Sequence, residues 1–65
     1  SQRSKIRTLI DLIAEMEKSF GKNIPIQDLK KAAEENGIED VEQIIRKMKE
    51  EGVIFEPKPG FVQKV

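Results

Sequence analysis

The chain has 65 residues, the size of one small domain, and is too small to enclose a deep substrate cavity. Cys and His are both absent, which excludes a disulfide framework and a thiolate nucleophile and removes the usual general base and metal ligand. Twelve Lys and Arg balance twelve Asp and Glu, and no apolar run exceeds three residues, so we expect a cytoplasmic domain without a membrane span.

The first predicted element is a helix over residues 5–19, with Ser4 as its N-cap and Gly21 as a left-handed C-cap residue. Residues 1–4 are then expected to be a linker remnant or a cloning scar. Spacings of three and four residues predict that one face of this helix is buried. That face consists of Ile6, Leu9, Ile10, Ile13, Met16 and Phe20.

Two shorter helices are predicted next, over residues 26–35 and 40–51. Pro25 suits the start of the first of them and leaves Ile24 as a short extended stub. Asn36-Gly37 ends that helix, and either Glu39 or Asp40 caps the next one. Two helices joined by a short turn containing Gly are typical of a helix-turn-helix. The predicted buried stripe of the last helix is Val41, Ile44, Ile45 and Met48.

Residues 53–65 are predicted to form a β-hairpin. Lys58-Pro59-Gly60-Phe61 carries Pro and Gly at the positions that a type II turn requires. Phe55 and Phe61 are expected to pack on the core, because Phe is commonly buried. The predicted fold class is mainly α (α+β): a single winged helix-turn-helix domain over residues 5–65, with a three-helix core and a C-terminal hairpin as its wing.

A helix-turn-helix suggests DNA contact through its last helix, which enters the major groove. With the apolar stripe turned inward, Gln43 and Arg46 point outward and could reach base edges. The cations placed to contact phosphates are Lys47, Lys49 and Lys58, with Arg3, Lys5 and Arg7 helping from the N-terminal end.

Acidic residues oppose this interpretation. Asp40 and Glu42 lie at the helix end that should meet DNA, and Glu42 and Glu50 are spaced to neutralise Arg46. Solubility is an equally good explanation for Arg46 and its neighbouring lysines. We therefore expect weak, salt-sensitive DNA contact. The alternatives are a transcription-type DNA binder, which would need a dimer or further basic segments, and a pure protein-docking domain.

Catalysis is the least supported class of function. The acidic pairs at 34–35, 39–40 and 50–51 are neighbours in sequence, so their side chains diverge into solvent. The four Gly residues fall at turns and form no phosphate-binding loop, and no calcium-type spacing of oxygen ligands occurs. We expect no catalytic residue, cofactor or metal.

The wing carries a family resemblance. Residues 52–62 follow the pattern Gly-x-Ile-aromatic-Glu-Pro-Lys/Arg-Pro-Gly-aromatic, and the segments at 5–13 and 23–29, KIRTLIDLI and NIPIQDL, fit the same layout. In this pattern the chain resembles the C-terminal winged-helix domain of archaeal minichromosome maintenance (MCM) proteins.

The resemblance implies an appendage of a hexameric, ATP-driven replicative DNA helicase in the nucleoid-associated cytoplasm of an archaeon. The family's phosphate-binding loop, magnesium motif and arginine finger lie in a preceding ATPase domain and do not occur in these 65 residues. The resemblance also implies a regulatory role in which this domain reduces the helicase and ATPase activity of its parent protein. The implied partners are the parent's ATPase domain, origin-binding initiator proteins and DNA. The isolated domain is expected to be a monomer.

Overall fold

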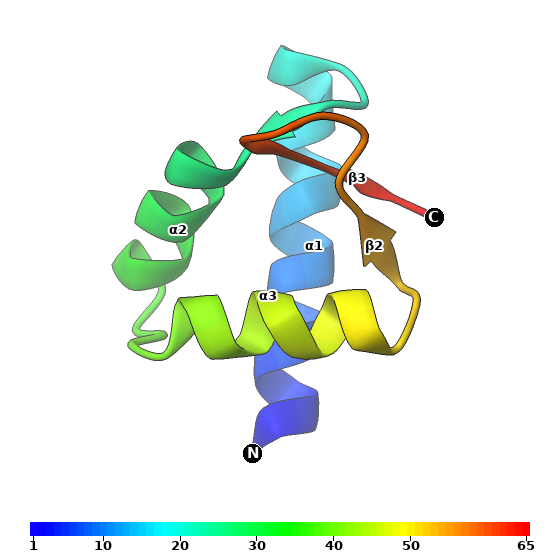
Figure 1. The fold of residues 1–65 in the computed structure, drawn as a ribbon. Helices are drawn as coiled ribbons and strands as arrows, with labels where there is room; N and C mark the ends of the chain where they lie inside the picture. Colours follow the sequence, from blue (N-terminus) through cyan, green and yellow to red (C-terminus); the bar gives the residue numbers. More distant parts are fainter.

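The computed structural model describes all 65 residues as three helices and three short strands. The helices are α1 (Gln2–Phe20), α2 (Ile26–Glu35) and α3 (Val41–Glu50), and the strands are β1 (Ile24–Pro25), β2 (Ile54–Phe55) and β3 (Phe61–Lys64). Figure 1 shows α1 running through the centre, α2 to one side and α3 crossing α1. The strands form an antiparallel sheet in the order β1-β3-β2. The predicted winged helix-turn-helix is confirmed.

Helix α1 begins earlier than the sequence predicted. Its N-cap is Ser1, whose hydroxyl accepts from the backbone N–H of Ser4 at 3.3 Å, so the prediction of Ser4 as the cap was wrong. Residues 2–4, expected to be a linker, form the first turn of the helix. At the other end Gly21 has φ 76° and ψ −157°. This is not the left-handed helical conformation that was predicted, but an extended region open almost only to glycine.

Helices α2 and α3 end in the same way, with paired hydrogen bonds that satisfy their last carbonyls. After α2, the N–H groups of Gly37 and Ile38 donate to Glu34 and Ala33, each at 3.0 Å. This is the Schellman arrangement, and equivalent bonds at residues 52 and 53 close α3. Asp40 occupies the N-cap position of α3, which decides between the two predicted caps, but its carboxylate makes no capping bond.

The wing has the predicted turn. The N–H of Phe61 donates to the carbonyl of Lys58 at 3.2 Å, and Gly60 has φ 88°, as the third position of a type II turn requires. Side chains alternate across the sheet, so Ile24, Ile54 and Val62 face the helices and are buried. The opposite side, which we call the outer sheet face, carries Pro25, Phe55, Phe61 and Gln63.

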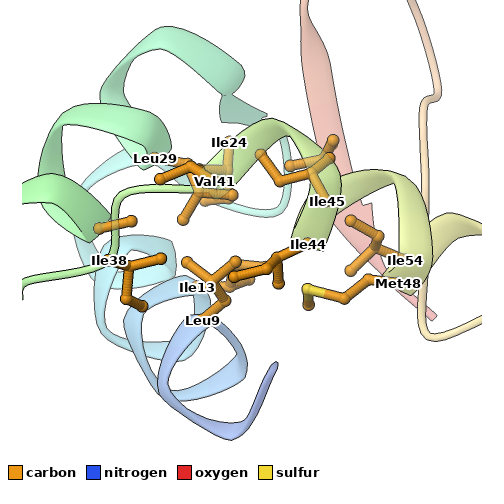
Figure 2. Close-up of a cluster of buried hydrophobic side chains, with 12 residues drawn as sticks. Leu9, Ile13, Ile24, Leu29, Ile38, Val41, Ile44, Ile45, Met48 and Ile54 are labelled. Carbon is orange, nitrogen blue, oxygen red and sulfur yellow. The ribbon is translucent and has the colours of Figure 1, made fainter. Parts of the chain in front are cut away.

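The core consists of twelve buried apolar residues and contains no buried polar side chain. All four residues of the predicted α3 stripe belong to it, and Figure 2 shows Ile44 pointing toward Leu9 and Ile13 of α1. The expectation for the aromatic residues was wrong. Phe20 and Phe55 are 46% and 44% exposed, because Phe20 lies in the last turn of α1 and strand alternation turns Phe55 away once Ile54 faces inward.

None of the helices is long and apolar enough to cross a bilayer.

Candidate nucleic-acid interface

The predicted contact residues of α3 all lie on its solvent side. Gln43, Arg46, Lys47 and Lys49 are exposed, because the buried stripe fixes the rotation of the helix. Lys49 also connects α3 to the wing, since its ammonium lies 2.6 Å from the carboxylate of Glu56. The other oxygen of Glu56 accepts from the backbone N–H of Gly60 at 3.4 Å. Helix α3 and the wing turn therefore form one connected surface.

Most cations on this surface are already paired with acids of the same chain. Lys49 is bound to Glu56, and Lys47 lies 3.7 Å from Glu51. Arg46 makes no ion pair, and neither does Lys58, whose ammonium lies 4.6 Å from the centroid of the Phe61 ring. Two unpaired cations, one on α3 and one at the wing, are therefore free to meet phosphates.

Neither Glu42 nor Glu50 forms the expected ion pair with Arg46. The carboxylate of Glu42 instead pairs with Lys30 of α2 at 2.7 Å, and Glu50 makes no ion pair. The hydrogen bond from Lys30 is the main cause that lowers the pKa of Glu42, and the charge of Arg46 also contributes to lowering it. The Lys30 side chain is only 27% exposed, because it lies between α2 and α3. Its ammonium is therefore held near Glu42, whereas Arg46, which lines the same hollow between the two helices, is exposed and makes no ion pair.

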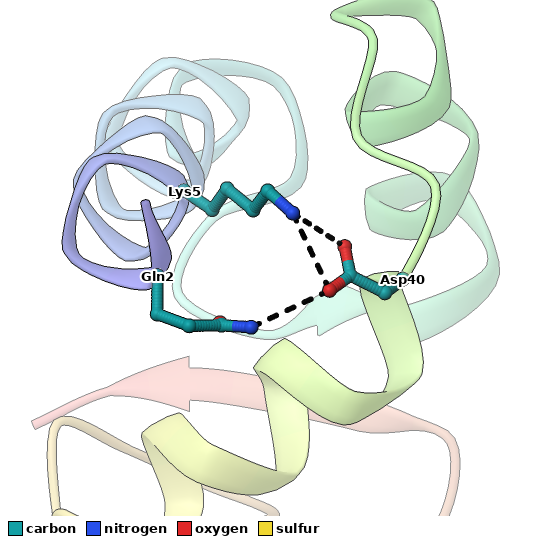
Figure 3. A network of polar contacts seen from close by, with 3 residues as sticks. All are labelled: Gln2, Lys5 and Asp40. Carbon is teal, nitrogen blue, oxygen red and sulfur yellow. Dashed lines mark hydrogen bonds and ion pairs between the residues drawn. The ribbon is translucent and has the colours of Figure 1, made fainter.

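The basic residues at the start of α1 are separated from the wing. Figure 1 places the N-terminus and the wing loop at opposite ends of the molecule. Lys5 is bound to Asp40 at 3.2 Å, and Gln2 donates to the same carboxylate at 3.5 Å (Figure 3). Arg7 lies 3.6 Å from Asp11. Of the three predicted N-terminal cations, only Arg3 has no acidic partner, so this group does not extend the α3–wing surface.

The sequence matches the model of a known protein family. The profile of the MCM protein C-terminal winged helix-turn-helix domain matches residues 1–65. The chain belongs to this family. The resemblance seen in the wing segment is thereby confirmed, and the MCM winged helix is an accessory module rather than the catalytic ATPase region. Searches of curated proteins and of solved structures give no significant match.

Sequence reasoning missed two residues that shape this surface of the MCM winged helix. Lys30 and Glu56 each bind an α3 residue from another element, at 2.7 and 2.6 Å. No spacing rule predicts such pairs, because their partners are brought close only by tertiary folding. The exposure of Phe55 had no sequence signal either, because strand alternation puts Ile54 and Phe55 on opposite faces without deciding which of these two apolar residues is buried.

A hollow beside the N-terminus of α3 is strongly acidic. Glu34, Glu39, Asp40 and Glu42 line it, and Lys30 is its only cation. In a helix-turn-helix this end of the helix approaches the bases. No group of acidic side chains in the MCM winged helix is arranged to hold a metal ion that would offset the charge. The hollow therefore opposes a nucleic-acid backbone and suits a positively charged partner.

The ion pairs shift the pKa values of their members. The hydrogen bond from Lys5 lowers the pKa of Asp40, the bond from Lys30 lowers the pKa of Glu42, and the bonds from Lys49 and the Gly60 N–H lower the pKa of Glu56. The bond to Glu42 raises the pKa of Lys30. Each folded carboxylate thus binds its proton more weakly than the unfolded one.

These directions predict the acid side of the stability profile. Because the unfolded chain binds more protons, the stabilisation by these carboxylates is complete above their ordinary pKa values of about 4 and is lost as the pH falls through the lowered folded values. We expect the melting temperature to fall between about pH 5 and pH 3. Glu56→Gln should lessen this fall, whereas Glu35→Gln, which removes an unpaired carboxylate, should not. Equal acid profiles for the two variants would contradict the role of Glu56.

Proposed function

We propose that this winged helix regulates its parent helicase chiefly through protein contacts and touches DNA only weakly, through Arg46 and Lys58. The observation that carries this proposal is the pairing of the surrounding cations. Lys30, Lys47 and Lys49 have acidic partners within 4 Å, so their charge is neutralised before DNA arrives. A DNA reader would normally present a cluster of free cations.

The charges at the N-terminal end of α3 also disfavour recognition of a specific DNA sequence. Base edges are met by the N-terminal residues of a recognition helix. Here that end presents Glu39, Asp40 and Glu42, and Gln43 is the only predicted base-contacting residue in its first turn. Bringing Gln43 to a base would place the unpaired Glu39 against phosphates, together with the ion-paired Asp40 and Glu42. Contact through the middle of α3 and the wing, without base recognition, is the orientation that the charges favour.

The acidic hollow supports the protein-contact part of the proposal. Asp40 and Glu42 are paired with Lys5 and Lys30, but the two remaining carboxylates, Glu34 and Glu39, have no ion pair and favour a Lys- or Arg-rich segment of a partner protein. The parent's ATPase domain and the initiator proteins implied by the family are the partners to test first. The family match favours this helicase module over a transcription-type DNA binder.

The test is an NMR titration of the chain with a short mixed-sequence duplex at several salt concentrations from about 20 to 150 mM. Each phosphate contact contributes about −0.9 to the slope of log K against log salt, so two free cations predict a slope of about −2. Shifts should centre on Arg46 and Lys58. A slope of −4 or steeper, or shifts centred on residues 39–43, would contradict the proposed DNA contact.

The protein arm of the test uses the parent's ATPase domain as the titrant. Shifts at the acidic hollow, weakened by salt, are expected. If the duplex shifts nothing at any of these salt concentrations, DNA contact is removed from the proposal. If the ATPase domain and the initiator proteins also shift nothing, regulation through direct docking is wrong.

A further inference from the structure

The outer sheet face combines two aromatic rings on one side of a sheet. Phe55 pairs across the strands with Gln63, and Phe61 lies two residues before Gln63 on β3, so the two rings occupy diagonal positions. Diagonal neighbours in an antiparallel sheet lie about 7–8 Å apart. Phe55 is 44% exposed and Phe61 is half-buried, so no other part of the chain covers Phe55 fully.

The charges around this face favour an anionic occupant. Its four residues include no acid, and the nearest acid in sequence, Glu56, is bound to Lys49. Lys58 is unpaired and rests over the Phe61 ring at 4.6 Å. Its flexible side chain could leave the ring for a phosphate, because a cation–π contact at an exposed site is weak. The acidic hollow beside α3 has the opposite character.

We propose that the outer sheet face binds single-stranded DNA by stacking bases on Phe55 and Phe61, with Lys58 contacting the backbone. Aromatic rings on a surface with free cations are the usual platform for single strands, because every base has a stacking face. A duplex hides those faces between its own base pairs. The proposal rests on the DNA-contact part of the proposed function and adds the form of DNA that the wing prefers.

The small area of the outer sheet face favours single-stranded DNA over a protein as the molecule that binds there. A stable protein interface buries about 800 Å² on each partner, about a fifth of the 4364 Å² surface of this chain. The sheet has strands of two, two and four residues, and only four side chains form its outer face. One or two bases can be stacked on such a face, whereas a protein partner would need to extend far beyond it.

The absence of Trp and Tyr from the chain allows a direct test. In a Phe55→Trp variant the introduced indole is the only strong fluorophore, and a base stacked on it should quench its emission. Phe20→Trp is the matched control, since Phe20 has nearly the same exposure, 46%, but lies at the end of α1. The titrants are an oligo(dT) 12-mer, an abasic strand with the same number of phosphates, and a duplex.

We expect quenching of the Phe55→Trp variant by oligo(dT), much less by the abasic strand or the duplex, and none of the Phe20→Trp variant. Phe55→Leu, which keeps an apolar side chain but removes the ring, should weaken oligo(dT) binding about tenfold, and Phe20→Leu should change it less than twofold. Equal quenching by the abasic strand and oligo(dT), or none by either, would overturn the stacking proposal. Duplex-induced shifts at Arg46 in the same protein would leave the proposed function intact.

Discussion

Ile44→Ala should lower the free energy of unfolding by about 2–5 kcal/mol. The Ile44 side chain is fully buried in the middle of α3 and points toward Leu9 and Ile13 of α1 (Figure 2). Truncation removes buried apolar surface and leaves a cavity that these neighbours can fill only in part, because they are themselves fully buried. The effect should be large because this side chain joins two helices.

A loss of about 2–5 kcal/mol is a large share of the total free energy of unfolding of this chain. A chain of this length is expected to be stable by about 3–10 kcal/mol, and each kcal/mol shifts the melting temperature of so small a domain by about 4–8 °C. Urea and thermal unfolding followed by circular dichroism would measure both quantities. Gln43→Ala, on the exposed side of the same helix, is the control and should change stability by less than about 0.5 kcal/mol. A loss below about 1 kcal/mol for Ile44→Ala would show that another residue is central to the α3 contact.

The fold was predictable wherever the spacing of the apolar residues was compatible with only one orientation of a helix or strand. Along α3, apolar residues recur only at intervals of one, three and four, so a single rotation buries all four of them, and the structure has that rotation. The wing was predictable in position because Pro59-Gly60 determines the turn. Which face of its first strand packs on the core was not predictable, since Val53, Ile54 and Phe55 are all apolar and all of residue types that are commonly buried. In the structure, the pairing of β2 with β3 turns Ile54 toward the core and Phe55 away from it.

The candidate site was predictable as a set of exposed positions, but its charge state was not. Lys47 and Glu51 are four residues apart on a helix, and they do pair. Glu42 and Arg46 have the same spacing and do not, because Lys30 from α2 is closer to Glu42. Local spacing thus decides ion pairs only when no residue from another element competes. Which cations of a small domain remain unpaired therefore follows from its tertiary structure and not from the spacing of charges in its sequence.

Glu42→Gln combined with Glu56→Gln should turn this winged helix into a stronger DNA binder. The two changes release Lys30 and Lys49 from their partners, which lie 2.7 and 2.6 Å away, so four cations rather than two can meet phosphates. Glutamine keeps the shape of the side chain, and its amide oxygen can still accept from the N–H of Gly60. The slope of log K against log salt should steepen from about −2 to about −4.

The affinity for a mixed-sequence duplex at about 20 mM salt should rise at least tenfold, and the gain should largely disappear at about 150 mM salt. The control is Asp28→Asn with Glu35→Gln, which changes net charge equally but releases no cation, because neither acid forms an ion pair. If the control gains as much as the test variant, net charge alone governs binding, and the ion pairs are not what weakens it. If neither variant gains and both remain folded, α3 and the wing do not face DNA, and docking to protein is the role left for this surface.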